Sequence, residues 1–404
     1  MKILHVNFSD IGGGAAQAVL RFHKLLINKK VESTMLVCEK KTNYNSIIGP
    51  QKTWEVFKIN AKKTISRNLK YIFETNNKNT HSMNLIPSGL FKKINEIKPD
   101  YVNLHWIGNE MISIKEISKI NSKIIWTLHD MWPFCGAEHY TIDKRYIEGY
   151  NKSNRPNHEK KFDLNKFVWK QKIKYFNNIE KIICTTDWMF QKASKSYLFK
   201  DKNIRKIPLT LDNNFWKPLN QKFAKNSLSL DENLITICYG AENYQSNKRK
   251  GFDLFREAVE NINSNIKFQI LLFGDDREFK FQNSSIKVIN YGKINDEHTI
   301  KTIFSASDYV IMPSRIEAFG QIVLEALHCG TACIIFKDTA MVDLIDHKKN
   351  GYICRNMTSI DLGEALEWCL NNSLENNRET ISKNISSKYD NEIIINKYLD
   401  FLEE

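Results

Sequence analysis

The chain has 404 residues, of which 42% are hydrophobic and 11% aromatic, which is enough apolar material for two packed domains and argues against a disordered or fibrous chain. No apolar run approaches the roughly 18 residues of a membrane span, and the first residues lack the apolar core of about 7–15 residues that a secretion signal needs. The net charge of +13 is uneven: residues 1–210 hold 37 Lys and Arg against 18 Asp and Glu (+19), and the remainder holds 22 against 28 (−6).

In chain order, short apolar runs predict strands at residues 3–7, 34–38, 101–104, 124–128 and 181–184, with helical periodicity over 15–27. The second half repeats the pattern, with strands at 234–239, 268–273, 286–289, 309–312 and 333–336 and helices at 252–262, 296–305, 319–329 and 362–370. Apolar strands alternating with helices predict an α/β protein with two Rossmann-like domains, each built on a parallel sheet. Two such sheets bind ligands at the carboxyl ends of their strands, which we expect to face a central cleft.

The boundary between the repeats is expected near Pro208 and Pro218, because proline disfavours a continuing helix. This gives a first domain over 1–208, a second over 209–385, and a final segment 386–404 that contains a helix at about 392–402. Two regions interrupt the rhythm. Residues 54–73 predict a basic amphipathic helix, which either packs on its domain (the favoured interpretation) or lies on a membrane surface. Residues 141–174 are lysine-rich and predict either an ordered insertion or a mobile loop.

The eight cysteines form no C-x-x-C pair, and several stand in apolar runs, which predicts reduced core residues of a cytoplasmic protein. The basic first half suits a negatively charged partner, either nucleic acid or an anionic membrane surface, and it is equally consistent with a solvated lysine-rich surface. Because no recognised motif interleaves aromatic residues with cations, we expect no nucleic-acid partner.

The segment 313–331 is the strongest candidate for chemistry. An apolar strand ends at Pro313, a short loop carries Glu317, and a helix begins near Gly320. The N–H groups at a helix start have no partner within the helix, so this start can bind a phosphate, and glycine allows close approach. Glu325 follows eight residues after Glu317, and two carboxylates suit a ligand rich in hydroxyl groups. Taken alone, such a pair is more often a coincidence on a solvated face.

Four further segments follow predicted strands or precede a helix. Gly12, Gly13 and Gly14 come directly after the first strand, where they permit positive φ angles, although their spacing is not a dinucleotide fingerprint. His105 and His129 each end a strand, where a ring N–H can bind a sugar hydroxyl or a phosphate. The cations of Lys248-Arg249-Lys250-Gly251 precede the helix at 252 and can stabilise a diphosphate leaving group.

The stretch around Glu317 and Glu325 resembles the E-x7-E donor signature of retaining glycosyltransferases of family 4 (group 1), which have the GT-B fold. The blocks Phe8-Ser9-Asp10-Ile11-Gly12-Gly13-Gly14 and Thr127-Leu128-His129-Asp130-Met131-Trp132-Pro133 resemble bacterial exopolysaccharide transferases of the colanic-acid cluster type. The resemblance spans nearly the whole chain. It implies that the last helix crosses back onto the first domain.

The resemblance also implies roles for single residues. His129 and Glu317 would contact the donor sugar, Glu325 the ribose, and Arg249 and Lys250 the diphosphate. The remaining residues would hold the diphosphate or line the acceptor side: Phe319, Gly320, Gln321, Ile322 and Gly240 for the donor, and Gly12, Gly13, Gly14 and His105 for the acceptor. One departure is that Gly240 is followed by Ala241-Glu242-Asn243, where many members carry an Arg. Arg249 is the expected substitute.

The implied reaction is a retaining sugar transfer from a UDP- or GDP-linked donor to a glycan or lipid-linked acceptor, in bacterial surface polysaccharide synthesis at the inner face of the membrane. No D-x-D motif occurs, so we expect neither metal nor cofactor, and the departing phosphate would deprotonate the acceptor. Glu317 and Glu325 would then be binding groups rather than a glycosidase pair. The alternatives are a non-catalytic sugar-nucleotide-binding subunit and a sugar-nucleotide epimerase on the same two-domain plan.

Overall fold

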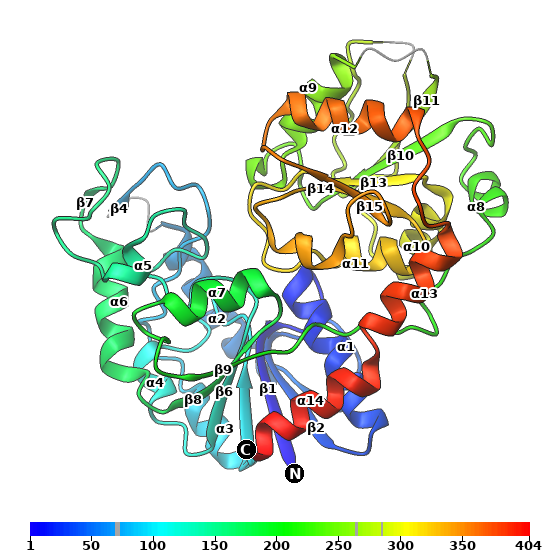
Figure 1. Ribbon diagram of the computed structural model, residues 1–404. Coiled ribbons are helices and arrows are strands. Elements are labelled where there is room, and N and C mark those ends of the chain that lie inside the picture. The colour runs from blue at the N-terminus through cyan, green and yellow to red at the C-terminus, as the bar shows by residue number, and fades with distance from the viewer. Residues whose placement is uncertain (69–72, 263–265, 284–285) are drawn as a thin grey trace. The chain divides into compact units, whose positions relative to one another are not determined.

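The computed structural model describes residues 1–404 except 69–72, 263–265 and 284–285 (Figure 1). The chain divides into two compact units. The first comprises Met1–Thr210 together with Ile394–Glu404, and the second comprises Leu211–Ile393. Among the described residues no helix combines the length and the apolar character needed to span a bilayer.

The first unit is built on a seven-stranded sheet in the order β3-β2-β1-β5-β6-β8-β9, and every neighbouring pair in it is parallel. Its strands are β1 (Lys2–Ser9), β2 (Glu32–Glu39), β3 (Ile47–Ile48), β5 (Tyr101–Leu104), β6 (Lys123–Leu128), β8 (Ile179–Cys184) and β9 (Asn203–Lys206). The central strands β1, β5 and β6 are buried along most of their length, as expected for a parallel sheet covered on both faces.

Among the described residues, seven helices of this unit precede the second unit in the chain. They are α1 (Gly14–Asn28), α2 (Thr53–Arg67), α3 (Leu90–Ile97), α4 (Ile114–Ile117), α5 (Arg145–Glu148), α6 (Leu164–Tyr175) and α7 (Asp187–Lys195). A separate antiparallel pair joins β4 (Phe73–Glu74) to β7 (Lys160–Lys161).

The second unit holds a six-stranded parallel sheet in the order β12-β11-β10-β13-β14-β15. Its strands are β10 (Ile235–Gly240), β11 (Phe268–Phe273), β12 (Lys287–Asn290), β13 (Tyr309–Met312), β14 (Ala332–Phe336) and β15 (Gly351–Cys354). The helices are α8 (Gln221–Ser227), α9 (Phe252–Glu260), α10 (Glu297–Ala306), α11 (Gln321–His328), α12 (Ser359–Asn371) and α13 (Arg378–Lys388), with 3-10 turns η2 (Lys248–Lys250) and η3 (Ala340–Leu344). Figure 1 shows α9 and α12 on one face of the sheet and α10 and α11 on the other.

The last helix, α14 (Asn391–Glu403), packs its C-terminal part on the first sheet. The Tyr101 hydroxyl donates to the Leu402 carbonyl at 2.7 Å, and the Asn103 amide donates to the Tyr398 hydroxyl at 3.1 Å. Lys181 Nζ donates to the carbonyls of Phe401 and Leu402 at 2.7 and 2.8 Å. A lysine that satisfies two carbonyls at a helix end replaces the intrahelical bonds missing there.

Most of the predicted elements are confirmed, and two expectations need correction. The helix expected over 54–73 ends at Arg67, and Phe73 belongs to β4. Residues 69–72 of that prediction lie outside the described residues. The helix expected over 319–329 begins two residues later, at Gln321, because Gly320 adopts a positive φ of 98°.

The region 141–174 is ordered rather than a mobile loop. Arg145, with only 1% of its surface exposed, donates to Glu159 and to Asp163 at 2.8 Å each and so joins α5 to the start of α6. The cysteines were expected to be reduced core residues, and this is confirmed, because all eight are buried and none forms a disulfide.

Candidate functional site

The loop after β13 carries Glu317, whose carboxylate faces the two cations of η2. Lys250 Nζ lies 2.7 Å from Glu317 Oε2, and Arg249 Nη1 lies 3.4 Å from the same oxygen. Arg249 Nη1 also donates to the Ile316 carbonyl at 2.9 Å. The structure therefore brings three of the sequence-predicted site residues together. Two cations against one carboxylate leave an excess positive charge at this loop.

Burial and ion pairing act in opposite directions on these groups. Burial by itself would raise the pKa of Glu317, but Lys250 and Arg249 beside it hold that pKa at about 2. Burial lowers the pKa of Lys250, while Glu317 opposes this shift. The side chains of Glu317 and Lys250 are 14% and 15% exposed, so water screens their interaction only weakly. The carboxylate is therefore ionised throughout the neutral range.

Two glycines stand where the backbone around this loop passes close to neighbouring atoms. Gly251 ends η2 with a φ of 71°, and a Cβ built there would lie 1.8 Å from the Pro313 carbonyl oxygen. Gly320 precedes α11 with a φ of 98°, and a Cβ there would lie 2.5 Å from Met341 Cγ. Any other residue at 251 would have to displace the backbone just after β13, and any other residue at 320 would have to displace the Met341 side chain. Glycine is therefore required at both positions by the backbone and by the neighbouring atoms.

The other donor-side residues surround the start of α11. Its N-terminus has no side-chain cap and no acidic residue in the first turn, so its N–H groups and dipole favour an anion. Phe319 is 5% exposed and Glu325, inside the helix, is 4% exposed. Gly240 ends β10, where a Cβ would lie 2.0 Å from the Phe273 ring. Gln321 and Ile322, the first two helical residues, are partly buried.

In the first unit, the predicted glycine loop joins β1 to α1. Gly12, Gly13 and Gly14 are exposed, and Gly12 and Gly13 have φ angles of 92° and 89°. The predicted positive φ angles are confirmed at these two positions. The buried carboxylate of Asp10 accepts backbone N–H groups from Lys41 and Thr42 at 2.8–3.0 Å and so fixes the loop to the end of β2.

His129 and His105 belong to a row of three imidazoles across β1, β5 and β6. His129 Nε2 lies 3.0 Å from His105 Nδ1, and His105 Nε2 lies 3.0 Å from His5 Nδ1. Burial lowers the pKa of His129 to about 4 and that of His5 to about 3, and it holds the pKa of His105 well below its usual value. All three rings are therefore neutral at neutral pH.

A buried polar network fixes the segment that follows His129. Lys172, with 0% exposure, donates to the carbonyls of Trp132, Cys135 and Gly136. Asp130 Oδ2 lies 2.6 Å from His139 Nδ1, and His139 Nε2 lies 2.9 Å from Ser82 Oγ. The order Asp–His–Ser has the form of a hydrolase triad, but Ser82 is 0% exposed and no substrate can reach it. These residues act as a scaffold for the His129 loop.

The sequence interpretation missed His5, Lys172, Asp130, His139 and Ser82. His5 stands inside strand β1, where a single polar residue in an apolar run gives no functional signal. The available signal was positional, since His105 and His129 directly follow β5 and β6, and β1, which carries His5 in its middle, is the neighbour of β5 in the sheet.

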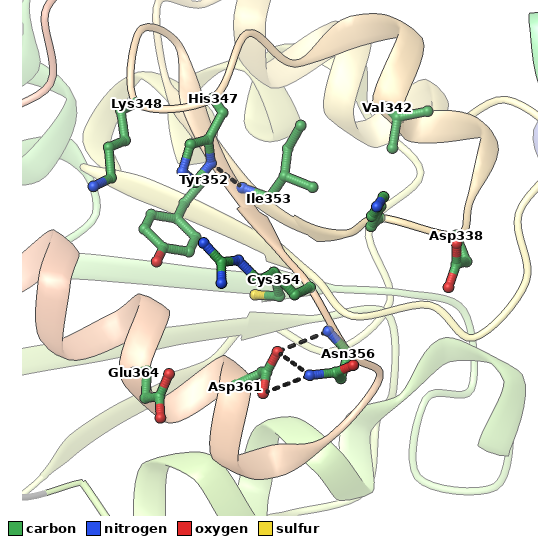
Figure 2. Close-up of a pocket in the computed structure, with 12 residues that line it drawn as sticks. Asp338, Val342, His347, Lys348, Tyr352, Ile353, Cys354, Asn356, Asp361 and Glu364 are labelled. Atoms are coloured by element: carbon green, nitrogen blue, oxygen red, sulfur yellow. Dashed lines mark hydrogen bonds between the residues drawn. The ribbon is translucent and has the colours of Figure 1, made fainter.

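A hollow lies elsewhere in the second unit. It has a volume of about 920 Å³ and is lined by residues after β14, along β15 and at the start of α12. Figure 2 shows His347 over Ile353, whose N–H donates to His347 Nδ1 at 3.0 Å, and Asp361 bonded to Asn356. None of the sequence-predicted site residues lines this hollow. Its charges are mixed, so the loop of Glu317 and the start of α11 remain the better candidate for an anionic ligand.

Two Rossmann-like units with parallel sheets define an α/β protein of the GT-B type. Solved structures with this fold extend over the whole chain. Sucrose-phosphate synthase from Thermosynechococcus elongatus matches with a TM-score of 0.68 and 14% identity, covering 100% of this chain and 98% of that one. The Anabaena protein HepE in complex with UDP and glucose matches with a TM-score of 0.64 and 14% identity, covering 100% and 99%.

Residues 221–388, which lie within the second unit, match the model of the family "Glycosyl transferases group 1". Among curated relatives, alpha-galactosylglucosyldiacylglycerol synthase of Streptococcus pneumoniae is 24% identical over 254 residues, which are 60% of this chain and 66% of the relative. The chain spans between about a third and two thirds of the length of the first curated relatives that it matches.

Proposed function

We propose that the chain is a retaining, metal-independent glycosyltransferase that moves a sugar from a nucleoside-diphosphate sugar to a glycan or lipid-linked acceptor. The observation that carries the proposal is the loop in which Lys250 and Arg249 flank Glu317, next to an uncapped helix start, within a region that matches the group 1 family model. Fixed cations and a helix dipole can stabilise the charge that develops on a departing diphosphate.

The residues divide between the sugar and the nucleotide. Glu317 would accept hydrogen bonds from sugar hydroxyls, and Glu325 would accept them from the ribose. The backbone over Phe319–Ile322 would hold the diphosphate, with Arg249 in the place of the family arginine that is missing after Gly240. His129 would donate a hydrogen bond to the sugar. We assign the donor to the second unit, and the acceptor to the first unit with the Gly12–Gly14 loop.

In the proposed reaction the bond between the anomeric carbon and the phosphate oxygen breaks, and the acceptor oxygen bonds to the same face of that carbon. The acceptor proton moves to the departing phosphate, so no protein nucleophile is needed. Lys250 and Arg249 would stabilise the leaving group as its negative charge grows. UDP or GDP is the proposed leaving group. The UDP found in the solved HepE structure favours UDP.

We place the acceptor in bacterial surface polysaccharide synthesis of the exopolysaccharide type, at the cytoplasmic face of a membrane. An anionic bilayer is the proposed docking partner, and α2 is the proposed contact. Trp54, Phe57 and Ile65, at helical spacing on one side of α2, are 52%, 74% and 49% exposed. Two lysines on other sides of α2 bond inward, with Lys63 paired to Glu39 and Lys62 donating to the Ile86 carbonyl. α2 therefore lies on its own unit through these polar contacts, in line with the favoured expectation of a surface helix packed on its domain, and it leaves an apolar side exposed.

A thermal-shift panel tests the donor assignment. UDP, GDP, ADP and TDP and their common sugars are compared, with Mg²⁺ and with EDTA, on the wild type, Glu325→Ala and the exposed control Glu379→Ala. A ligand at a hundredfold excess over its Kd should stabilise the wild type and the control by about 2.7 kcal/mol, and Glu325→Ala by less. No shift with any nucleotide would remove the central proposal.

Product analysis separates the alternatives. A transferase forms a glycoside and loses activity in His129→Ala and Glu317→Ala while still folding. An epimerase converts the nucleotide sugar without any acceptor, and a non-catalytic subunit binds it without turnover. Transfer that persists in EDTA supports a metal-independent reaction.

Vesicle flotation tests the membrane assignment. The wild type should float with anionic vesicles at low salt and be released by high salt, because surface charge attraction is screened. The double variant Trp54→Asp/Phe57→Asp should not float with the vesicles and should remain in the dense fraction. Phe223→Asp, which changes an equally prominent residue (64% exposed) in the second unit, should float like the wild type. Equal flotation of all three proteins would assign the contact to another surface.

A further inference from the structure

The three imidazoles of His5, His105 and His129 form a continuous hydrogen-bonded row. Their ring centroids are 5.2 Å apart at both steps, with interplanar angles of 37° and 35°. His105 uses both of its ring nitrogens, Nε2 toward His5 and Nδ1 toward His129. The two hydrogen bonds of His105 point to different rings, so the ring nitrogens of the three histidines do not converge on one point as the ligands of a metal ion do. The row is a chain of hydrogen bonds.

Neutral imidazole has one N–H and one bare nitrogen, and this restricts the row to two proton arrangements. In one, each ring donates toward His5, which leaves a proton on Nε2 of His5 and a bare Nδ1 on His129. In the other, each ring donates toward His129, which leaves a bare Nε2 on His5 and a proton on Nδ1 of His129. Which ring nitrogen of His129 carries the proton is thus coupled to which nitrogen of His5 carries it, although His105 lies between the two rings.

The environment of His5 distinguishes the two arrangements. Its Nε2 is buried without a hydrogen-bond partner, and the residue is 0% exposed. The neighbouring His23 offers no partner, because its two ring nitrogens are engaged by Ser33 at 2.7 Å and Ser46 at 2.9 Å. The Phe22 ring lies edge-on at 6.1 Å between centroids. Orphaned N–H donors are rarer in protein interiors than under-satisfied acceptors, so the bare nitrogen belongs at this end.

The other end of the row is open to a ligand. His129 is only partly buried, and its Nδ1 makes no hydrogen bond within the described residues. This nitrogen is not one of the buried polar atoms that lack a partner, so it is accessible to solvent. The segment that follows is fixed by Asp130, His139 and Lys172, so the His129 backbone has little freedom. The ring is therefore held both by its loop and by its bond to His105.

We infer that His105 and His5 are positioning residues that hold His129 in the single tautomer with its proton on Nδ1, so that this ring presents a hydrogen-bond donor to the substrate. Only the expected effect on catalysis rests on the proposed function; the tautomer of His129 does not. A fixed donor matches an oxygen acceptor such as a sugar hydroxyl or a phosphate oxygen. A ring free to exchange tautomers would present a bare nitrogen part of the time.

Long-range ¹H–¹⁵N spectra of the full chain with ¹⁵N-labelled histidine test the tautomer, and His129→Gln assigns the signals. In the wild type we expect His129 to show an N–H resonance at Nδ1 and a hydrogen-bonded bare nitrogen at Nε2. His105→Leu removes both bonds of the row and should abolish this fixed pattern. His105→Gln supplies an amide N–H for His129 and a carbonyl for His5, so it should restore the pattern.

Kinetics give the second readout. His105→Leu should lower kcat about 10- to 100-fold, as removal of the partner that orients a functional histidine does, with the Kd for UDP unchanged. His105→Gln should recover most of the rate. A proton on Nε2 of His129 in the wild type would overturn the inference, as would an unchanged tautomer in a folded His105→Leu. If the wild-type spectrum shows the expected tautomer but no nucleotide sugar reacts, the proposed function fails and the tautomer assignment stands.

Discussion

The Nζ of Lys250 lies 2.7 Å from Oε2 of Glu317 and joins the turn before α9 to the loop after β13. Both side chains are largely buried, so each neutralises a charge that would be costly alone. The pair closes the same loop that leads into α11. The proposed binding of the diphosphate and the stability of the second unit would therefore depend on the same atoms.

Lys250→Met should destabilise the second unit, because Glu317 keeps its buried charge with only Arg249 nearby. We expect a loss of about 2–4 kcal/mol in the free energy of unfolding. Denaturant titration measures it. The double variant Lys250→Met/Glu317→Gln should recover part of the loss, since neither charge remains. A double variant as unstable as the sum of the single variants would show that the pair is not coupled.

Gly251→Ala should disrupt the same turn. The positive φ and the approach of its Cβ to the Pro313 carbonyl predict a loss of at least about 2 kcal/mol and weaker nucleotide binding. Gly363→Ala, in the interior of α12, is the matched control. Its nearest atom would be 3.9 Å from the new Cβ, so it should stabilise the protein by about 0.5–1 kcal/mol. Thermal unfolding of the two variants should therefore shift in opposite directions.

Lys172→Met fills the lysine's volume but leaves the carbonyls of Trp132, Cys135 and Gly136 without their donor. We expect a loss of about 2–4 kcal/mol in the free energy of unfolding of the first unit. Lys170→Met, on the exposed side of α6, should have little effect. Equal stability of the two variants would show that water can satisfy these carbonyls.

Stability should fall with pH below about 6.5. Burial lowers the pKa of His5 to about 3, and of His23 and His129 to about 4, from an ordinary value of 6.5. Between pH 6.5 and 4 the unfolded chain binds protons that the native rings exclude. Each such histidine therefore removes about 1.4 kcal/mol of stability per pH unit as the pH falls.

Denaturant midpoints at pH 7.5, 6 and 5 measure this slope. His23→Gln should reduce it, while His158→Gln, at an exposed position, should not. An identical slope in the wild type and in His23→Gln would contradict the assignment of His23 as a buried neutral ring.

Much of the fold could be predicted because parallel strands are continuous apolar runs. The runs at 101–104, 268–273 and 309–312 coincide with strands β5, β11 and β13. The edge strands β9 and β15 were missed because an edge strand is less buried and its pattern is weaker. In β9, for example, no residue is fully buried.

The amphipathic pattern of α2 predicted a helix but not its orientation. The alternation of apolar and basic residues does not indicate which face of the helix packs against the rest of its unit. That was decided by the partners available, since Glu39 and the Ile86 carbonyl attract Lys63 and Lys62 inward and leave Trp54 and Phe57 exposed.

The sequence by itself determined the two parallel sheets and the segment containing Glu317, because strand burial and helix starts follow from local patterns of residues. Only the tertiary structure decided the partners. It set Lys250 and Arg249 against Glu317, 67 and 68 positions away, and it aligned His5, His105 and His129 from three separate strands. Contacts between residues far apart in the chain depend on strand order and register, which no local pattern specifies.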